Sequence, residues 1–299
     1  MIKKIIKSIV EGTFIDKIKL RLLMKKKNID DLNYLNQMGK LMISKDFNCL
    51  QPKTFNEKLQ AYKIYSKDKN WTNYVDKYEV RKIVSEKIGE EYLIPLLAEF
   101  DSPSEIDFDK FKEKCVFKVN HDSGGVCIFD PQKTNVKELK QKLNKHFANE
   151  FSDFYKEYPY RGMKKRIIVE KFIGDTNPPI DYKFFCFNGE IDSIMVCFDR
   201  GTSDPKFYFT DESWNVLPYN KRALNEPNGF KIAKPDNLSE MYQIVKKLAQ
   251  GFPFVRIDMY NIHGTIYFGE FTFFPDAGFD KNILKETDLL WGEKLILND

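Results

Sequence analysis

An arginine and two acidic residues lie close together in the stretch FPFVRIDMYNIHGTIYFGEFTFFPDAG (252–278). Arg256 and Asp258 are two residues apart, and Glu270 and Thr272 follow after a short polar turn. Alternating apolar and polar residues on both sides of the turn predict a β-hairpin, in which residues two apart share a face. The hairpin would bring both carboxylates to one site, and carboxylate oxygens are the ligands that Mg²⁺ prefers. This set is typical of phosphoryl transfer, because a metal ion and a guanidinium both offset the charge of phosphate oxygens.

A lysine and a glycine-bearing loop form a second candidate site. Lys118 lies near the end of a predicted strand, and the loop that follows contains Ser123, Gly124 and Gly125. Backbone amides of such a loop can hold phosphates, because glycine lets the chain approach a ligand closely. Taken alone, the same stretch is a plain β-turn.

Six stretches in this order resemble the TupA-like ATP-grasp proteins of cell-surface polysaccharide biosynthesis. They are KTFNEKLQ (53–60), VDKYEVRKIV (75–84), KIGEEYLIPLL (87–97), FKVNHDSGGV (117–126), DYKFFCFNGE (181–190) and GFPFVRIDMY (251–260). The resemblance covers roughly residues 53 to 279. It implies an α+β ATP-grasp fold, in which two α+β lobes enclose ATP, and it implies ATP and Mg²⁺ as cofactors.

The resemblance also implies roles for individual residues. Lys118, Ser123, Gly124 and Gly125 match the part of the family that contacts the phosphates, and Arg256 would stabilise charge on an acylphosphate. The metal ligands would be Asp258, Glu270 and Thr272. The hinge that meets the adenine would be Glu170, Lys171, Phe172 and Ile173, with Asp181 and Lys183 at the ribose or a phosphate. Lys206 and Arg200 are weaker candidates for the γ-phosphate.

Each of these sites has a plainer alternative on the residues alone. The hinge is then a strand end with an exposed charge pair, Asp181 and Lys183 form a surface salt bridge, and Arg256 pairs with the two carboxylates in solvent. Two positions depart from the family, since Thr272 stands where Asn is usual and Asp276 where Gly follows the proline. A threonine hydroxyl can still bind Mg²⁺. Asp276 is the more serious departure, because it affects the backbone turn beside the metal.

Hydrophobic periodicity predicts the elements that position these residues. Thr54 and Glu57 form a capping box at the start of a helix. Further helices are predicted at 76–89, 137–151 and 235–251. Strands are predicted at 92–97, 115–119, 126–129, 167–169, 182–187 and 191–199, the last two joined by a turn at Asn188-Gly189.

The 299 residues carry a net charge of +4, of which the N-terminal segment supplies more than the whole. Residues 1–27 contain nine Lys and Arg against Glu11 and Asp16, a local balance of +7. Residues 2–24 have helical apolar spacing, which predicts either a helix on an anionic membrane surface or one packed on its own domain. Five cysteines without paired close spacing indicate a reducing cytoplasm.

Four segments are expected: a basic amphipathic helix (1–27), an N-terminal α/β part on the substrate side (28–112), a nucleotide-binding lobe (113–175), and a catalytic and metal-binding lobe (176–299). The function implied by the resemblance is an ATP-dependent carboxylate–amine ligase that acts through an acylphosphate, with a carboxylate-bearing glycan and an amine as substrates. No nucleic-acid partner is expected, and no oligomeric state is predicted. Alternatives are a glycosyltransferase or sugar kinase of the same pathway, or a non-catalytic nucleotide- or glycan-binding protein.

Overall fold

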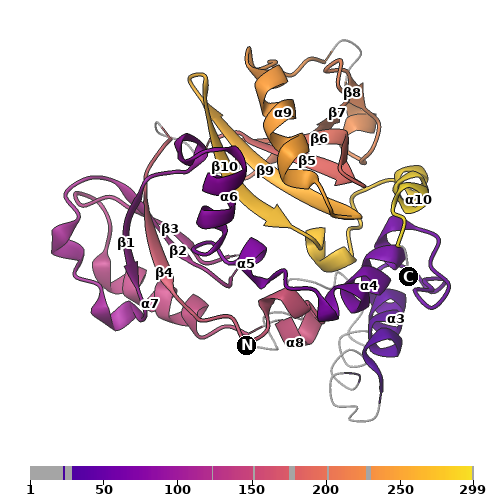
Figure 1. Ribbon diagram of the computed structural model, residues 1–299, viewed down its shortest axis with the longest axis horizontal. Coiled ribbons are helices and arrows are strands. Elements are labelled where there is room, and N and C mark those ends of the chain that lie inside the picture. The colour runs from indigo at the N-terminus through magenta and orange to yellow at the C-terminus, as the bar shows by residue number, and fades with distance from the viewer. Residues whose placement is uncertain are drawn as a thin grey trace.

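The computed structural model describes residue 23 and residues 29–122, 124–150, 152–174, 179–200, 202–226 and 230–297. The predicted basic helix, apart from Leu23, and Ser123 of the predicted phosphate loop lie outside the described residues. Two antiparallel sheets with helices packed on them form the molecule, so the predicted α+β class is confirmed (Figure 1). Within the described ranges, no helix has both the length and the apolar character needed to cross a bilayer.

The smaller sheet has four strands in the order β1 (Leu96–Phe100), β4 (Ile167–Lys171), β2 (Cys115–Val119) and β3 (Val126–Phe129). In β2 the side chains of Cys115, Phe117 and Val119 are buried in the core of this sheet, which includes helix α7 (Val136–Phe147). Because successive side chains of a strand point to opposite faces, Lys118 lies on the other face of the sheet.

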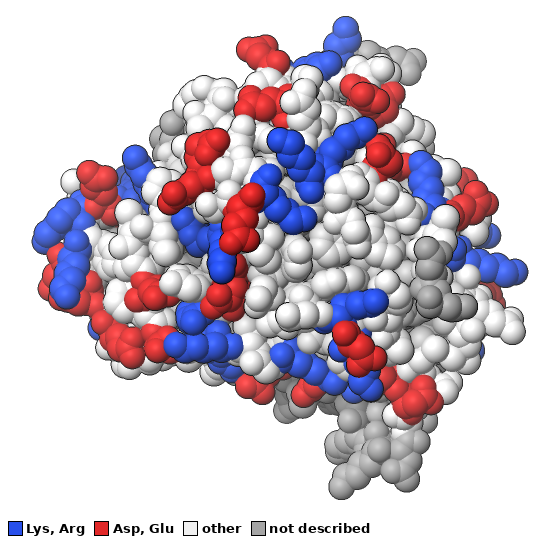
Figure 2. Space-filling view, viewed as in Figure 1, with Lys and Arg blue, Asp and Glu red and all other residues white. Residues whose placement is uncertain are grey.

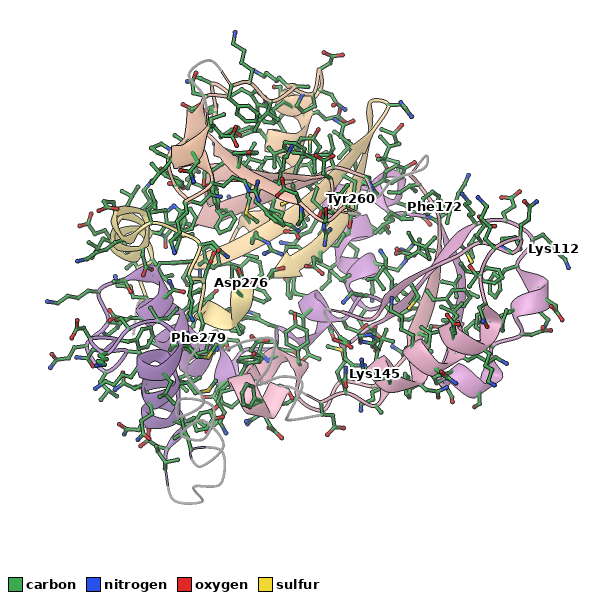
Figure 3. The ribbon with its side chains drawn as sticks, turned by 180° about the vertical axis from the view of Figure 1, so that it is seen from behind. Lys112, Lys145, Phe172, Tyr260, Asp276 and Phe279 are labelled. Atoms are coloured by element: carbon green, nitrogen blue, oxygen red, sulfur yellow. The ribbon has the colours of Figure 1, made fainter. Side chains whose placement is uncertain are left out.

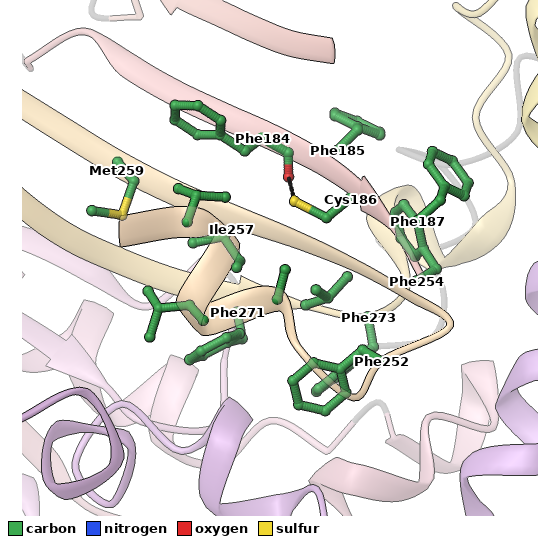
Figure 4. Close-up of a cluster of buried hydrophobic side chains, with 14 of the residues drawn as sticks. Phe184, Phe185, Cys186, Phe187, Phe252, Phe254, Ile257, Met259, Phe271 and Phe273 are labelled. Carbon is green, nitrogen blue, oxygen red and sulfur yellow. Dashed lines mark hydrogen bonds between the residues drawn. The ribbon is translucent and has the colours of Figure 1, made fainter. Parts of the chain in front are cut away.

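The larger sheet has six strands, and its core is highly aromatic (Figure 4). The order is β10 (Thr265–Thr272), β9 (Phe254–Ile262), β5 (Asp181–Phe187), β6 (Glu190–Phe198), β7 (Lys206–Thr210) and β8 (Val216–Leu217). Every residue of β5 is buried, because helices cover both faces. Phe184 packs on Tyr242 of α9 (Leu238–Ala249), and Phe185 stacks on Trp291 of α10 (Lys285–Lys294) on the other face.

Two predicted hairpin turns are confirmed. Asn188-Gly189 joins β5 to β6, and His263-Gly264 joins β9 to β10. In both pairs each residue has a positive φ, 51° and 84° in the first and 50° and 84° in the second. Two-residue turns of this kind match the twist of the strands they connect. The second turn aligns the strands that carry Asp258 and Glu270.

The N-terminal helices are α3 (Asp31–Met42), α4 (Phe55–Tyr65), α5 (Thr72–Val75) and α6 (Val80–Ile88). The last three pack on the core of the larger sheet, whereas α3 packs on α4 in a separate apolar cluster. The capping box at Thr54 and Glu57 is present. The helix predicted at 76–89 begins later, at Val80, because the Asp76 carboxylate accepts from the backbone N–H of Tyr78 and of Glu79 in a turn before it.

One predicted strand is misplaced. The segment 92–97 contains the end of a 3₁₀ turn, Glu90–Tyr92, and β1 starts only at Leu96. The strand pairs with β4, so it belongs to the smaller sheet rather than to a separate N-terminal α/β layer. The expected boundary at residue 112 therefore divides one sheet.

The remaining helical segments are short. They are α8 (Ser152–Tyr155) and 3₁₀ turns at Ser66–Asp68, Pro103–Glu105, Phe108–Lys110, Tyr158–Tyr160, Ala223–Asn225 and Pro275–Gly278. All five cysteines are buried and free.

Candidate functional site

A pocket of about 450 Å³ lies between the two sheets and is closed on one side by α6. Its walls come from β2, β3 and β4 of the smaller sheet and from β5, β9 and β10 of the larger one. On the face seen in Figure 2, lysine and arginine side chains alternate with aspartate and glutamate. The volume is in the range of small-molecule sites. Of the predicted site residues, those that line it are Lys118, Gly124, Glu170, Lys171, Phe172, Ile173, Lys183, Asp258 and Glu270.

The predicted hinge forms the apolar end of this pocket. Lys171 is the last residue of β4, and Phe172 and Ile173 follow it; all three line the pocket. Val116, Ile128 and Ile168 add apolar walls. Figure 3 shows Phe172 and Tyr260 where the two sheets approach each other. Apolar walls at the end of a strand suit a base, although the Lys171 N–H already donates to the Pro95 carbonyl at 3.0 Å.

Glu170 lines the pocket and is also paired with protein side chains. Its carboxylate is buried and holds two cations, with Lys118 Nζ at 2.5 Å from Oε2 and Arg81 Nη1 at 3.2 Å from Oε1. The carboxylate is therefore engaged with protein side chains and directs Lys118 along the pocket wall. Arg81 and Lys77 both line the pocket as well.

The Arg256 guanidinium is the centre of the predicted catalytic cluster. Its Nε donates to Asp258 Oδ1 at 2.7 Å, and its Nη2 donates to Asp258 Oδ2 at 2.9 Å, to Thr272 Oγ1 at 3.0 Å and to Glu270 Oε1 at 3.3 Å. The strand register places Glu270 directly opposite Asp258 and Thr272 opposite Arg256. The predicted convergence of these four residues is thus present in the geometry.

Gly269 permits this register and was not predicted from the sequence. The β9–β10 ladder has a bulge between Phe268 and Glu270, and a Cβ at Gly269 would lie 2.9 Å from the backbone oxygen of Asp258. Any side chain there would push β10 away from β9. A lone glycine inside a strand pattern is the only signal the sequence offered for it.

The charges of the cluster are held in place by burial and by one another. Burial opposes ionisation of Asp258, but Arg256 and Lys183 outweigh it and keep the pKa of the carboxyl below its usual value. Burial likewise opposes the charge of Lys183, and Asp258 raises the lysine pKa above its usual value. All three groups are therefore charged at neutral pH. The pair of Arg256 with the carboxylates faces the pocket region rather than open solvent, since Asp258 is only 3% exposed.

The three predicted metal ligands fit a hard divalent cation. Asp258, Glu270 and Thr272 present oxygen atoms to one cationic nitrogen, Arg256 Nη2, so their donor atoms already converge on a positive charge. Among the residues that the structure describes, no group of three or more His, Cys, Asp or Glu side chains is placed to hold a metal. Mg²⁺ is commonly held by one or two carboxylates together with substrate phosphates. A carboxylate pair with a hydroxyl meets that requirement.

Asp181 supports the site from behind the pocket wall. It is buried and does not line the pocket; its Oδ2 accepts from Arg200 and lies 3.6 Å from Lys183 Nζ. The two cations it holds do line the pocket. Asp181 itself is therefore not exposed to the pocket, and its pair with Lys183 is buried rather than the surface salt bridge of the plainer alternative.

Lys206 is not brought to the site. It lies on β7, which is separated from β5 by β6, and its Nζ is 3.7 Å from Asp199 Oδ2 and over the ring of Phe198. Arg200, at the end of β6, occupies the pocket wall instead. Gly125 is also outside the pocket lining; its carbonyl accepts from Val119 N at 3.0 Å and closes the β2–β3 turn.

The turn after β10 explains how the chain accommodates Asp276. Asp276 and Ala277 have φ values of 47° and 53°, in the left-handed region that glycine adopts most easily. Lys63 Nζ donates to the Ala277 carbonyl at 2.7 Å and Gln60 Nε2 to the Gly278 carbonyl at 2.6 Å, so α4 holds the turn from beneath. Aspartate thus replaces glycine here without loss of the turn.

We expect Asp276→Gly to be more stable than Asp276→Ala by about 1 kcal/mol, because a left-handed conformation is unfavourable for any residue with a Cβ. Both variants remove the same charge, so their difference isolates the backbone. Urea unfolding of the two proteins measures it. Equal midpoints would mean that the turn relaxes when the carboxylate is removed.

Comparison with known proteins gives one family match and several distant structures. The profile of the TupA-like ATP-grasp family matches residues 57–296. No protein of curated function matches the chain. Similar solved structures are D-alanine–D-alanine ligase from Bacillus anthracis with ATP (16% identity, TM-score 0.41, 74% of this chain and 64% of that chain) and L-amino acid ligase from Bacillus licheniformis (15%, 0.44, 75% and 49%). A third is the ATP-grasp ligase PsnB with its minimal precursor, Mg and ADP (9%, 0.38, 73% and 57%). The chain thus spans less than two thirds of each of these proteins.

Proposed function

Because the chain belongs to the TupA-like ATP-grasp family, we propose that it is an ATP-dependent carboxylate–amine ligase. Its acid substrate is a uronic acid of a cell-surface polysaccharide or of a precursor, and the second substrate is an amino acid or another amine. ATP and Mg²⁺ are the cofactors of this family. The observation that carries the proposal is the convergence of Arg256, Asp258, Glu270 and Thr272 beside a pocket of nucleotide size.

In the proposed reaction, a carboxylate oxygen of the acid attacks the γ-phosphorus of ATP, the bond from that phosphorus to the β-phosphate oxygen breaks, and ADP leaves. The amine nitrogen then attacks the acyl carbon of the acylphosphate, the carbon–oxygen bond breaks, and phosphate leaves as the amide forms. The proton lost by the amine passes to solvent.

The residues of the chain divide this work by position. Lys118 and Lys183 line the pocket on opposite sheets and would contact the phosphates, while Arg256 lies beyond the carboxylates and would stabilise charge on the acylphosphate. Bound at Asp258 and Glu270, Mg²⁺ supplies positive charge against the phosphate oxygens. Burial of Asp258 fixes its orientation, whereas Glu270 is 42% exposed and free to turn toward a ligand.

Product analysis distinguishes the competing functions. A ligase releases ADP and phosphate only when both an acid and an amine are present. A sugar kinase forms ADP and a phosphorylated sugar without an amine, a glycosyltransferase consumes no ATP, and a binding protein binds ATP without turnover. ADP formation without an amine, with phosphate retained on the sugar, would refute the ligase.

The setting of the reaction is also proposed. Five buried, free thiols suit a reducing cytoplasm, where the glycan precursor would be met at the inner face of the membrane. Segment 1–24, with its basic residues, would make that contact, and cosedimentation with anionic and neutral vesicles tests it.

We expect Lys118→Ala to weaken ATP binding by at least about tenfold, since a hydrogen bond to a charged partner contributes roughly 1.5–3 kcal/mol. Lys110→Ala is the matched control, because Lys110 lies in the same lobe and is 79% exposed. Titration calorimetry measures both affinities, and melting without ATP reports on folding. Equal ATP affinities in the two variants would remove Lys118 from the phosphate site.

A further inference from the structure

A second pocket, of about 320 Å³, lies on the other side of the loop 120–125 from the first. Its size is at the lower end of the range for small-molecule sites. It is formed by that loop, by the segment that follows α7 and by the segment that precedes β4. The residues that matter here are His121, Asn149, Ser152, Tyr160, Arg161 and Lys165.

The two pockets share the loop as a wall. The buried Asp122 carboxylate accepts from Gly124 N at 3.0 Å through Oδ1 and from Asn149 Nδ2 at 3.1 Å through Oδ2. Gly124 lines the first pocket and Asn149 lines the second. Lys77 Nζ donates to the Asp122 backbone oxygen at 3.2 Å, which ties the same loop to the first pocket. A ligand of the second pocket would therefore lie next to the phosphate end of a nucleotide.

Tyr160 connects the second pocket to the catalytic cluster. Burial and the negative charges of Glu157 and Glu270 raise the pKa of its hydroxyl well above the usual value, and Arg256 acts in the opposite direction. Tyr160 also packs against the core of the larger sheet, the sheet whose strand β10 carries Glu270 and Thr272.

His121 offers this pocket an unused acceptor. Its Nδ1 lies 3.2 Å from Asn120 Oδ1, and the amide of Asn120 is oriented by its Nδ2, which donates to Asp76 Oδ2 at 2.9 Å. Asn120 Oδ1 accepts, so His121 Nδ1 carries the proton and Nε2 is an acceptor. Nε2 is buried and makes no hydrogen bond with the described residues. His121 is only 7% exposed. A hydroxyl group in the pocket would satisfy it.

Arg161 and Lys165 give the pocket two positively charged side chains whose acidic partners a ligand can replace. Arg161 Nε lies 2.9 Å from Asp153 Oδ1, and Lys165 Nζ lies 2.9 Å from Glu150 Oε1. The two acidic partners are 80% and 75% exposed, so water competes for them and the pairs are weak. A carboxylate that enters the pocket can replace either partner, and the guanidinium fork suits such a group.

We propose that this second pocket binds a sugar that carries a carboxylate, and that this sugar is the acid substrate of the ligase. The inference rests on the proposed function and adds the location of the acid and the residues that bind it. Arg161 and Lys165 bind the carboxylate-bearing ring, the unpartnered nitrogen of His121 accepts from a sugar hydroxyl, and Asn149 and Ser152 supply further polar contacts. The pocket places the sugar beside Tyr160 and, across the loop held by Asp122, beside Gly124 of the first pocket.

The test uses α-1,4-linked digalacturonate as the probe and the full chain with Mg²⁺ and the non-hydrolysable ATP analogue AMP-PNP. Saturation-transfer NMR and calorimetry measure binding of the probe to wild type, to Lys165→Met and to Arg161→Met/Lys165→Met. Lys164→Met is the matched control, because Lys164 is the next residue in the chain but does not line the pocket and pairs with exposed Asp101. We expect the double variant to bind the probe at least tenfold more weakly, with Lys164→Met unchanged. A neutral digalactoside should bind wild type at least tenfold more weakly than the probe.

Equal affinity of the probe for the control and the double variant would place the sugar elsewhere and overturn the inference. So would equal affinity of wild type for the charged and the neutral disaccharide. Affinity for AMP-PNP in every variant verifies that the first pocket is intact, and Lys165→Met alone is the milder change if the double variant does not fold. Wild type that binds AMP-PNP but not the probe overturns this inference alone, whereas wild type that does not bind AMP-PNP overturns the proposed function itself.

Discussion

Replacing Arg256 with alanine is expected to lower ATP-dependent turnover by roughly a hundredfold or more. This is the usual loss when an enzyme loses one positioned group that stabilises charge in the transition state. The affinity for ATP should change little, because Arg256 does not line the nucleotide-sized pocket and contacts only Asp258, Glu270 and Thr272 among the described residues. The measurements are ADP release with a uronic acid and an amine, and calorimetric titration with ATP.

A second variant is needed, because Arg256 also stabilises the folded protein. Removing one partner of a buried ion pair destabilises a protein by roughly 3–5 kcal/mol. Arg256→Lys keeps the charge beside Asp258 but lacks the fork, so it should fold and still lose at least about tenfold in turnover. Arg222→Ala is the control, since Arg222 forms an ion pair with Asp204. Loss of ATP affinity equal to the loss of turnover would assign Arg256 to nucleotide binding.

The hairpin of the catalytic cluster was predictable because its signals are local. Alternating residues and the His263-Gly264 turn determine the hairpin and its register up to Phe268, which pairs with Met259. The bulge at Gly269 shifts that register by one residue and decides which residue faces Asp258. A glycine in a strand pattern indicates a bulge without giving its position, so this part required the structure.

Predictions that depended on sheet order or on long-range partners were less accurate. Lys206 has the charge of a phosphate contact, but the order of the larger sheet puts β6 between its strand and β5. Glu170 was expected at the nucleotide, yet Lys118 and Arg81, far away in sequence, occupy its carboxylate. Residue type and local spacing carry no information about such partners.

Changing Glu270 to glutamine should abolish the Mg²⁺-dependent part of the stabilisation by ATP. A ligand that binds only the folded state adds RT ln(1 + [L]/Kd), about 2.7 kcal/mol at a hundredfold excess over Kd. Thermal unfolding with ATP and Mg²⁺, compared with ATP and EDTA, isolates the contribution of the metal. Glu270 is a sharper test than Asp258, because Asp258 is bonded to both Arg256 and Lys183 and its removal would leave buried cations without a partner.

Glutamine at 270 keeps the contacts that glutamate makes with the protein. An amide oxygen can still accept from Arg256 Nη2 and from the Thr272 hydroxyl, which lie 3.3 Å and 3.2 Å from Oε1. Stability without ligand should therefore stay close to that of wild type, and only the negative charge available to a metal is lost. Glu190→Gln is the control, since Glu190 is 71% exposed on β6 and pairs with Lys246. If Mg²⁺ increased the stabilisation by ATP equally in both variants, Glu270 would not be a metal ligand.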